Sequence, residues 1–202
     1  MGTLRFFNLQ PLMEKYGCRT LFETGTGLGD GMLYASYYAF ERLWSVEIHP
    51  DIAATARERF VGDPRVEIVN ETSEEALARI LPTVDRDQPI LFWLDAHFPG
   101  ADFGLASYQD EPDADRRLPL ERELALIGKL RHPCRDVLLI DDLRIYEDGP
   151  WEQGAMPDFA QTLPPAMRNI DFALRPPWSQ THELQRFNQH TGYLVLAPRA
   201  RR

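Results

Sequence analysis

An acid and three glycines stand close together near the start of the chain, where they could hold a charged ligand. The segment reads ETGTGLG, with Glu23 at the end of an apolar stretch and Gly25, Gly27 and Gly29 after it. Glycines at a turn between a strand and a helix let a ligand lie against bare backbone, and the helix N-terminus adds partial positive charge. Glu47 follows Gly25 by 22 residues, where an acid at the tip of a second strand can accept both ribose hydroxyls. These residues predict a nucleoside-binding βαβ unit.

The spacing of the glycines separates two classes of nucleoside ligand. The dinucleotide motif is G-x-G-x-x-G, and its third position here falls on Asp30 or Met32. Glu23, just before the first glycine, would repel a pyrophosphate but suits a ligand with an ammonium and a sulfonium group. The pattern therefore favours S-adenosylmethionine over NAD. A glycine-rich turn without a ligand is the alternative, and the presence of both Glu23 and Glu47 argues against it.

The elements that must position these residues follow from the apolar patterning. Ser73 is the expected N-cap of one helix, and two late apolar segments, 169–174 and 192–197, are expected to close the sheet as an antiparallel pair. Strands that alternate with helices predict a doubly wound α/β sheet, whose ligands lie at the carboxyl ends of its strands. The other expected strands span 20–24, 43–48, 65–70, 89–95 and 136–142, and the expected helices span 8–17, 30–42, 50–60, 73–81 and 119–131.

Composition limits the class of protein. With 202 residues, 44% of them hydrophobic, the chain suits one well-buried domain over 1–202. It has no apolar run of about eighteen residues and no signal-peptide start, so a cytoplasmic protein without a membrane partner is expected. A net charge of −9 argues against a nucleic-acid partner. Cys18 and Cys134 lack metal-ligand spacing and are expected to be buried thiols.

A second group of chemically active residues ends two other expected strands. The segments WLDAH and LLIDD place Asp95, His97, Asp141 and Asp142 at strand ends that should be neighbours. Three carboxylates close together need a compensating cation, and hard oxygen ligands select Mg²⁺, Mn²⁺ or Ca²⁺, of which Mg²⁺ or Mn²⁺ is expected here. The alternative is that the acids cap strands and helices, with Asp141 paired to an arginine such as Arg144.

His97 is the best candidate for a general base, because a neutral imidazole beside these acids can take a hydroxyl proton. A metal ligand or a loop hydrogen-bonding residue is the alternative for His97. The irregular segment 98–118 that follows is rich in Gly, Asp and Pro. A loop of that length in a compact domain predicts a mobile lid over an acceptor site.

These motifs together resemble the class I S-adenosylmethionine-dependent methyltransferases. ETGTGLG with VEIHP carries the resemblance over about residues 18–142, and WLDAH with LLIDD resembles the metal-dependent O-methyltransferases of sugars. The resemblance implies a Rossmann-like, mostly parallel seven-stranded sheet with the last strand antiparallel, and a homodimer. It implies a metal bound by Asp95, Asp141 and Asp142, and catalytic roles for Asp95, His97 and Asp142, although D-A-H stands where the family has D-G-D. The implied cofactor-binding residues are Glu23, Thr24, Gly25, Thr26, Gly27, Gly29, Glu47, Ile48, His49, Glu71, Thr72, Ser73 and Asp95.

The expected function is therefore methyl transfer from S-adenosylmethionine to a hydroxyl of a sugar, polysaccharide or glycoside precursor, with Mg²⁺ or Mn²⁺ lowering the pKa of that hydroxyl. Tyr108, Trp151 and Trp178 are candidates to stack on sugar faces, or else ordinary packing residues. One alternative is an O-methyltransferase of a catechol or other phenol. The other is a nucleoside-binding protein without catalytic activity.

Overall fold

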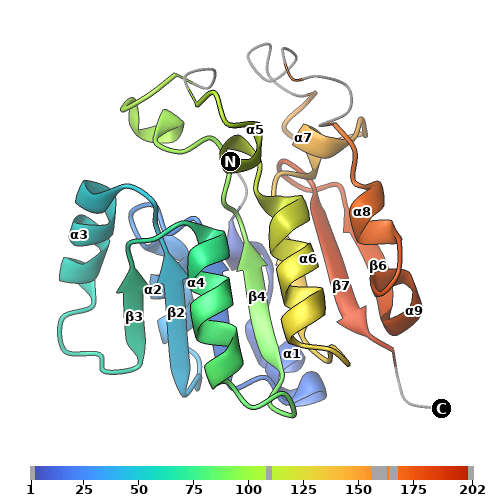
Figure 1. Cartoon of the computed structure of the whole chain (residues 1–202), viewed down its shortest axis with the longest axis horizontal. Coiled ribbons are helices and arrows are strands. Elements are labelled where there is room, and N and C mark those ends of the chain that lie inside the picture. Colours follow the sequence, from blue (N-terminus) through green and yellow to red (C-terminus); the bar gives the residue numbers. More distant parts are fainter. Residues whose placement is uncertain (1–2, 108–110, 156–162, 164–167, 200–202) are drawn as a thin grey trace.

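The computed structural model of the chain describes residues 3–107, 111–155, 163 and 168–199. Within these ranges, seven strands form one sheet in the order β3-β2-β1-β4-β5-β7-β6 (Figure 1). The first five strands run parallel, and β7 is antiparallel to both of its neighbours. The strands are β1 (Thr20–Thr24), β2 (Arg42–Val46), β3 (Val66–Val69), β4 (Ile90–Leu94), β5 (Val137–Ile140), β6 (His182–Phe187) and β7 (Tyr193–Pro198).

Helices cover both faces of the sheet, as the sequence pattern predicts. One face packs on α1 (Leu9–Tyr16), α2 (Asp30–Ser36) and α3 (Pro50–Arg59), and the other packs on α4 (Ser73–Ile80) and α6 (Leu120–Leu130). In Figure 1, α4 and α6 lie in front of the strands, while α1 and α2 lie behind them. Among the helices of the described ranges, none has the length and apolar character that a membrane span requires.

The short elements connect these layers. They are α5 (Ala114–Arg117), α7 (Leu143–Tyr146), α8 (Asp171–Leu174), α9 (Trp178–Thr181) and the 3₁₀ helices η1 (Leu4–Phe6), η2 (Leu81–Thr83) and η3 (Ala101–Phe103). Several of them lie at the edge where the parallel strands end, and this edge is uppermost in Figure 1. We call it the carboxyl edge of the sheet, and we call the opposite edge the amino edge.

The expected helix over 30–42 is too long. The helix α2 ends at Ser36, and β2 begins at Arg42. The reason is a distant side chain, because the guanidinium of Arg65 donates to the carbonyl oxygens of Ser36 at 3.0 Å and Tyr38 at 3.1 Å. These bonds satisfy carbonyls that the helix leaves free as the chain turns into β2.

The expected strand over 169–174 is wrong. This segment contains the helix α8, and the strand that completes the sheet is β6. The side chain of Asn169 accepts a hydrogen bond from the backbone N–H of Asp171 at 2.7 Å, which favours a helical start. As an edge strand with four of its six residues polar or charged, β6 lacks the apolar run that the interior parallel strands display.

The N-cap of α4 also lies one residue earlier than expected. Thr72 is the N-cap, and its hydroxyl accepts from the backbone N–H of Glu75 while the Glu75 carboxylate accepts from that of Thr72. This reciprocal capping box makes Ser73 the first helical residue. Pro50 stands in the first turn of α3, where its missing N–H costs no helical hydrogen bond.

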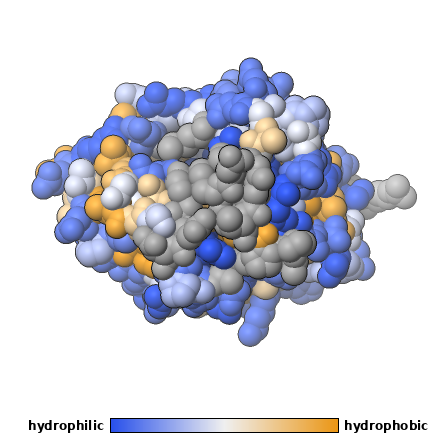
Figure 2. All heavy atoms as spheres, turned by 90° about the horizontal axis from the view of Figure 1, so that it is seen from above, coloured by the Kyte–Doolittle hydropathy of each residue, from blue (hydrophilic) through white to orange (hydrophobic). Residues whose placement is uncertain are grey.

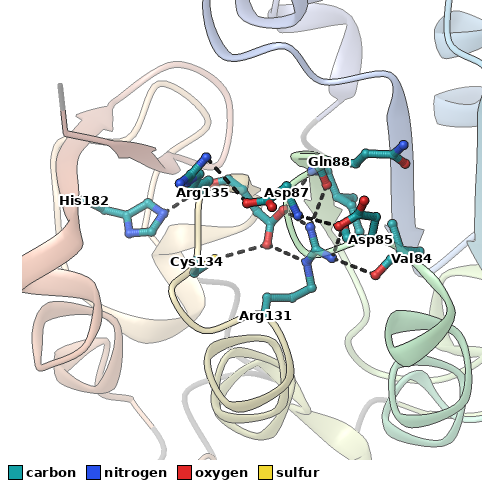
Figure 3. Close-up of polar contacts among 10 residues, drawn as sticks. Val84, Asp85, Asp87, Gln88, Arg131, Cys134, Arg135 and His182 are labelled. Atoms are coloured by element: carbon teal, nitrogen blue, oxygen red, sulfur yellow. Dashed lines mark hydrogen bonds and ion pairs between the residues drawn. The ribbon is translucent and has the colours of Figure 1, made fainter. Parts of the chain in front are cut away.

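A buried ion pair fixes the amino edge of the sheet. Arg131 and Asp136 are 1% and 0% exposed, and two guanidinium nitrogens donate to the Asp136 carboxylate at 3.0 Å each. As Figure 3 shows, Arg131 also donates to the carbonyl oxygens of Val84, Asp85 and Gln88. The pair therefore joins α6 and β5 to the segment that leads from η2 into β4.

Candidate active site

The carboxyl edge aligns three chain segments through hydrogen bonds that continue the strand ladders. The backbone N–H of Gly25 donates to Val46 O at 3.0 Å, and that of Asp95 donates to Thr24 O at 3.1 Å. One strand further along, the N–H of Asp141 donates to Leu94 O at 3.1 Å. The glycine-rich turn and both acid motifs therefore lie side by side, as parallel strands require.

Close packing explains the glycine that opens the turn after β1. Gly25 has φ +81°, and a Cβ atom there would lie 2.6 Å from the carbonyl oxygen of Asp95. Any side chain would therefore collide with the neighbouring strand end as well as strain the backbone. The turn keeps its backbone bare where a ligand could contact it.

Glu23 is buried at the end of β1 and lies beside this turn. Its carboxylate accepts a hydrogen bond from Ser45 Oγ at 2.5 Å, and Ser45 Oγ is also 2.6 Å from Thr26 Oγ1. Burial raises the pKa of Glu23 to about 8, although the bond from Ser45 opposes the shift. A cationic ligand group beside Glu23 would favour its ionised form.

Glu47 is held firmly at the end of β2. Its two carboxylate oxygens accept from the backbone N–H groups of Gly27 and His49, each at 3.0 Å. These bonds hold the carboxylate against the glycine-rich turn, where it can accept hydrogen bonds from ribose hydroxyls.

A cavity of about 470 Å³ lies along this edge. Its walls include both the glycine-rich turn and the WLDAH motif that follows β4. Of the residues expected from the sequence to bind cofactor or do chemistry, those that line it are Glu23, Gly25, Thr26, Gly27, Glu47, Ile48, Glu71, Thr72, Ser73, Asp95 and His97.

Three of the expected cofactor-binding residues do not line the cavity. Thr24 is fully buried at the end of β1. Gly29 packs against Phe60, and the His49 ring packs against the backbone of Gly100. Gly29 and His49 shape the cavity through the residues next to them, as the N-caps of α2 and α3.

The LLIDD motif, which ends on Asp141 and Asp142, lies next to His97 beside the cavity. His97 Nε2 lies 2.9 Å from Asp142 Oδ2, and Nδ1 lies 3.6 Å from Asp95 Oδ1. Asp142 is 6% exposed and has φ +50°, a conformation that a non-glycine residue adopts at a cost of about 1–3 kcal/mol. The strained turn after β5 therefore directs Asp142 toward the imidazole.

The charges in this group are unevenly compensated. Burial acts to raise the pKa of Asp142, but the hydrogen bond and charge of His97 outweigh it and lower the pKa to about 2. Burial would lower the pKa of His97, and its bond to Asp142 raises it instead. For Asp141, burial and the charge of Asp142 raise the pKa to about 7. The pKa of Asp95 is raised by burial and by the charge of Asp141.

The structure gives no support for the three-carboxylate metal site expected from the sequence. Among the described residues, no group of three or more His, Cys, Asp or Glu side chains is arranged to hold a metal ion. Asp142 turns to His97, and its other oxygen lies 3.5 Å from Arg144 Nε, so the arginine pairs with Asp142 and not with Asp141. The imidazole and the guanidinium thus lie where the sequence analysis placed a metal beside Asp142.

Asp95 and Asp141 nevertheless fit a cation held by two carboxylates. Burial and the charge of Asp141 raise the pKa of Asp95, and burial and the charge of Asp142 raise that of Asp141, because these buried carboxylates lie close together. Within the described ranges, Asp141 Oδ2 is buried and has no hydrogen-bond partner. Mg²⁺ is often bound through one or two carboxylates, with water or substrate completing its shell.

Two of the three aromatic candidates for stacking on a sugar are core residues. Trp151 and Trp178 are 7% and 2% exposed and belong to the hydrophobic core, so they are packing residues. Tyr108 lies outside the described residues. The segment 98–118 contributes Phe103 instead, whose ring would lie 3.2 Å from a Cβ atom at Gly27.

The segment 98–118 is more regular than its sequence suggests. It contains η3 and α5, with residues 108–110 outside the described ranges. Leu28, Phe103 and Leu105 are exposed hydrophobic residues. Figure 2 views the carboxyl edge from above and shows hydrophobic surface gathered on one side of a largely hydrophilic face.

Sequence reasoning missed one buried acid close to the site. Glu123 on α6 is 0% exposed, and burial raises its pKa to about 7 while the hydroxyls of Ser73 and Thr24 oppose the shift. The signal was its position on the apolar face of an expected helix, where an acid is rare.

Comparisons with known proteins agree on the fold. No protein-family model and no curated protein matches the chain. A candidate rRNA methylase from Clostridium thermocellum superposes with a TM-score of 0.61 at 11% identity, over 98% of this chain and 99% of that one. The chain has a class I methyltransferase fold.

Two further solved structures share this fold. A candidate caffeoyl-CoA O-methyltransferase from Staphylococcus aureus gives a TM-score of 0.60 at 12% identity, over 97% of this chain and 82% of that one. The SAH-bound methyltransferase PaMTH1 from Podospora anserina gives a TM-score of 0.59 at 15% identity, over 94% of this chain and 75% of that one. Identities this low show a common architecture, so function must be argued from the residues at the carboxyl edge.

Proposed function

We propose that this chain is an S-adenosylmethionine-dependent O-methyltransferase. The observation that carries the proposal is that one cavity is lined by Glu23, the glycine-rich turn, Glu47 and His97. Glu23 suits the ammonium of this cofactor and Glu47 suits its ribose, and the glycine-rich turn lets the cofactor lie against the backbone between them. His97 adds a proton acceptor at the same cavity.

The chemistry is a direct displacement. The acceptor hydroxyl oxygen forms a bond to the methyl carbon, the sulfur–carbon bond breaks, and S-adenosylhomocysteine leaves. His97 takes the hydroxyl proton, and Asp142 stabilises the imidazolium that forms because it lies 2.9 Å from Nε2. The raised pKa of His97 strengthens it as an acceptor once its own proton has left. Alignment of the two reactants supplies much of the remaining rate.

The acceptor in this proposal is a hydroxyl of a sugar or glycoside, held in part by a divalent cation. Asp95 and Asp141 would hold the ion, which when bound would lower the pKa of the acceptor hydroxyl. Asp141 Oδ2 supports this assignment, because it is a buried carboxylate oxygen without a described partner. A phenol is the second acceptor to test, since one protein of this fold is described by its action on caffeoyl-CoA.

Methyl transfer from radiolabelled cofactor to a panel of sugars, glycosides, catechols and caffeoyl-CoA tests the proposal. We expect labelled product with a sugar acceptor, loss of transfer with EDTA, and recovery with Mg²⁺ or Mn²⁺. Transfer that survives exhaustive chelation would remove the metal from the proposal. Transfer to phenols alone would replace the sugar, and no transfer to any acceptor together with no cofactor binding would refute the proposed function.

A further inference from the structure

The N-terminal segment before α1 is fixed against two distant elements. The backbone N–H of Thr3 donates to the Tyr193 hydroxyl at 3.0 Å, and the Phe6 ring stacks on the Tyr193 ring with centroids 4.8 Å apart. On α2, the Tyr34 hydroxyl donates to Phe7 O at 2.9 Å. The segment is therefore held between α2 and the start of β7.

This placement makes the segment one wall of the cavity. Thr3, Leu4 and Arg5 line it together with Glu23. Glu23 and this segment both lie against α2, because a Cβ atom at Gly31 would collide with Glu23 Oε1, and Tyr34 on the same helix bonds to Phe7 O. In the proposed binding mode Glu23 takes the ammonium and Glu47 the ribose, so the wall that carries Arg5 lies on the amino-acid side of the cavity.

Arg5 brings an unpaired positive charge to an acidic cavity. Glu23, Glu47 and Asp95 are among the many acids that line it, and its cationic lining residues are Arg5 and Arg116. The Arg5 guanidinium makes no hydrogen bond or ion pair with any residue that the structure describes. Arg116 on α5 instead lies 3.9 Å from the carboxylate of Asp113, which directly precedes that helix.

We propose that Arg5 binds the α-carboxylate of the cofactor's amino-acid part. This inference rests on the proposed function, because it needs S-adenosylmethionine as the ligand. The amino-acid part carries an ammonium and a carboxylate on one carbon. Glu23 can accept from the ammonium, and the planar guanidinium of Arg5 can donate two parallel hydrogen bonds to the carboxylate. The N-terminal segment is thus a specificity element for the cofactor.

The test compares S-adenosylhomocysteine with its decarboxylated analogue, which keeps the amine and the thioether. Calorimetry would measure both ligands with the wild-type chain and with Arg5→Ala, Arg5→Lys and Arg116→Ala. Arg5→Ala should weaken S-adenosylhomocysteine about 10- to 150-fold, the usual range for a lost hydrogen bond to a charged group. The analogue should bind wild type and Arg5→Ala equally within about twofold, and Arg5→Lys should recover part of the loss.

Several results would overturn the assignment. Equal weakening of both ligands by Arg5→Ala would mean that the side chain supports the segment and does not read the carboxylate. Unchanged binding of both would mean that Arg5 faces solvent. If Arg116→Ala, and not Arg5→Ala, lost the preference for S-adenosylhomocysteine over its decarboxylated analogue, Arg116 would be the residue that binds the carboxylate. Failure of the wild-type chain to bind either ligand would instead refute the proposed function, so the two failures are distinguishable.

Discussion

Two buried groups of charged residues lie at opposite edges of the sheet, and they differ in how their charges are compensated. At the amino edge, both oxygens of Asp136 accept from Arg131, and they also accept from Ile90 N and Cys134 Sγ. At the carboxyl edge, within the described residues, Asp141 Oδ2 has no hydrogen-bond partner, and Asp142 Oδ1 has no hydrogen bond and only an ion pair with Arg144 at 3.5 Å.

The difference indicates what each group does. Buried polar atoms in native proteins nearly always have partners, so a group that leaves oxygens unpaired needs a reason other than stability. Burial and neighbouring charge raise the pKa of Glu23, Asp95 and Asp141 at the carboxyl edge. Glu23 and Asp95 also line the cavity. Perturbed acids in a cavity indicate a functional site, whereas the paired group at the amino edge stabilises the fold.

The largest expected effect is on stability at the amino edge. Asp136→Ala would leave the fully buried Arg131 without its counter-charge, which costs about 3–5 kcal/mol. We expect a fall in Tm on the order of 6–20 °C, measured by scanning calorimetry. The double variant Arg131→Met with Asp136→Leu should recover much of this loss, because it removes both charges. A single variant as stable as wild type would contradict the structural role.

The next effect is on catalysis at the carboxyl edge. His97→Ala should lower the turnover rate by about 10²–10⁴, the contribution of a positioned proton acceptor. Cofactor affinity should stay nearly intact, since Glu23 and Glu47 are untouched. His132→Ala, an exposed histidine at the end of α6, is the matched control. A His97→Ala variant with normal turnover would show that another group takes the proton.

A smaller effect concerns the pH dependence of stability. The pKa of Glu23 is about 8 in the folded chain against an ordinary 4.5, so the folded state binds the extra proton between these values. Its stabilising contribution is present below pH 4.5 and is lost as pH rises through 8. Without ligand, the free energy of unfolding of Glu23→Gln should therefore rise relative to that of wild type by about 1–3 kcal/mol from pH 5 to pH 9.

Thermal melts of both proteins across this range would measure the difference. Glu14→Gln, which changes an exposed acid on α1, is the control and should follow wild type at every pH. If Glu23→Gln tracks wild type as well, Glu23 is ionised in the free protein and the acids at the two edges are not as different as their environments suggest.

The sequence predicted the elements that have strong local signals. The parallel strands read as apolar runs ending on acids, so β1, β4 and β5 were predictable, and the convergence of Asp95 with Asp141 followed from strand adjacency. The helix α2 was overextended because Arg65 ends it from 29 residues away. The polar edge strand β6 was missed because its alternation is weak.

Side-chain pairing was the hardest part of the site to predict. Nothing local indicated that Asp142 would turn to His97 through a left-handed backbone conformation. The place of the N-terminal segment at the cavity was also hidden, because Thr3 and Phe6 hold it there through contacts with Tyr193, 190 residues after Thr3. Such long-range contacts have no sequence period.

Calorimetric titration of S-adenosylhomocysteine and NAD into the wild-type chain and Glu47→Ala tests the central claim most directly. We expect the wild-type chain to bind S-adenosylhomocysteine and not NAD. Glu47→Ala should weaken that binding by about 1.5–3 kcal/mol, the range for a lost hydrogen bond to a charged group. Glu58→Ala, an exposed acid on α3, should bind normally. Tight binding of NAD with no response to S-adenosylhomocysteine would contradict the account.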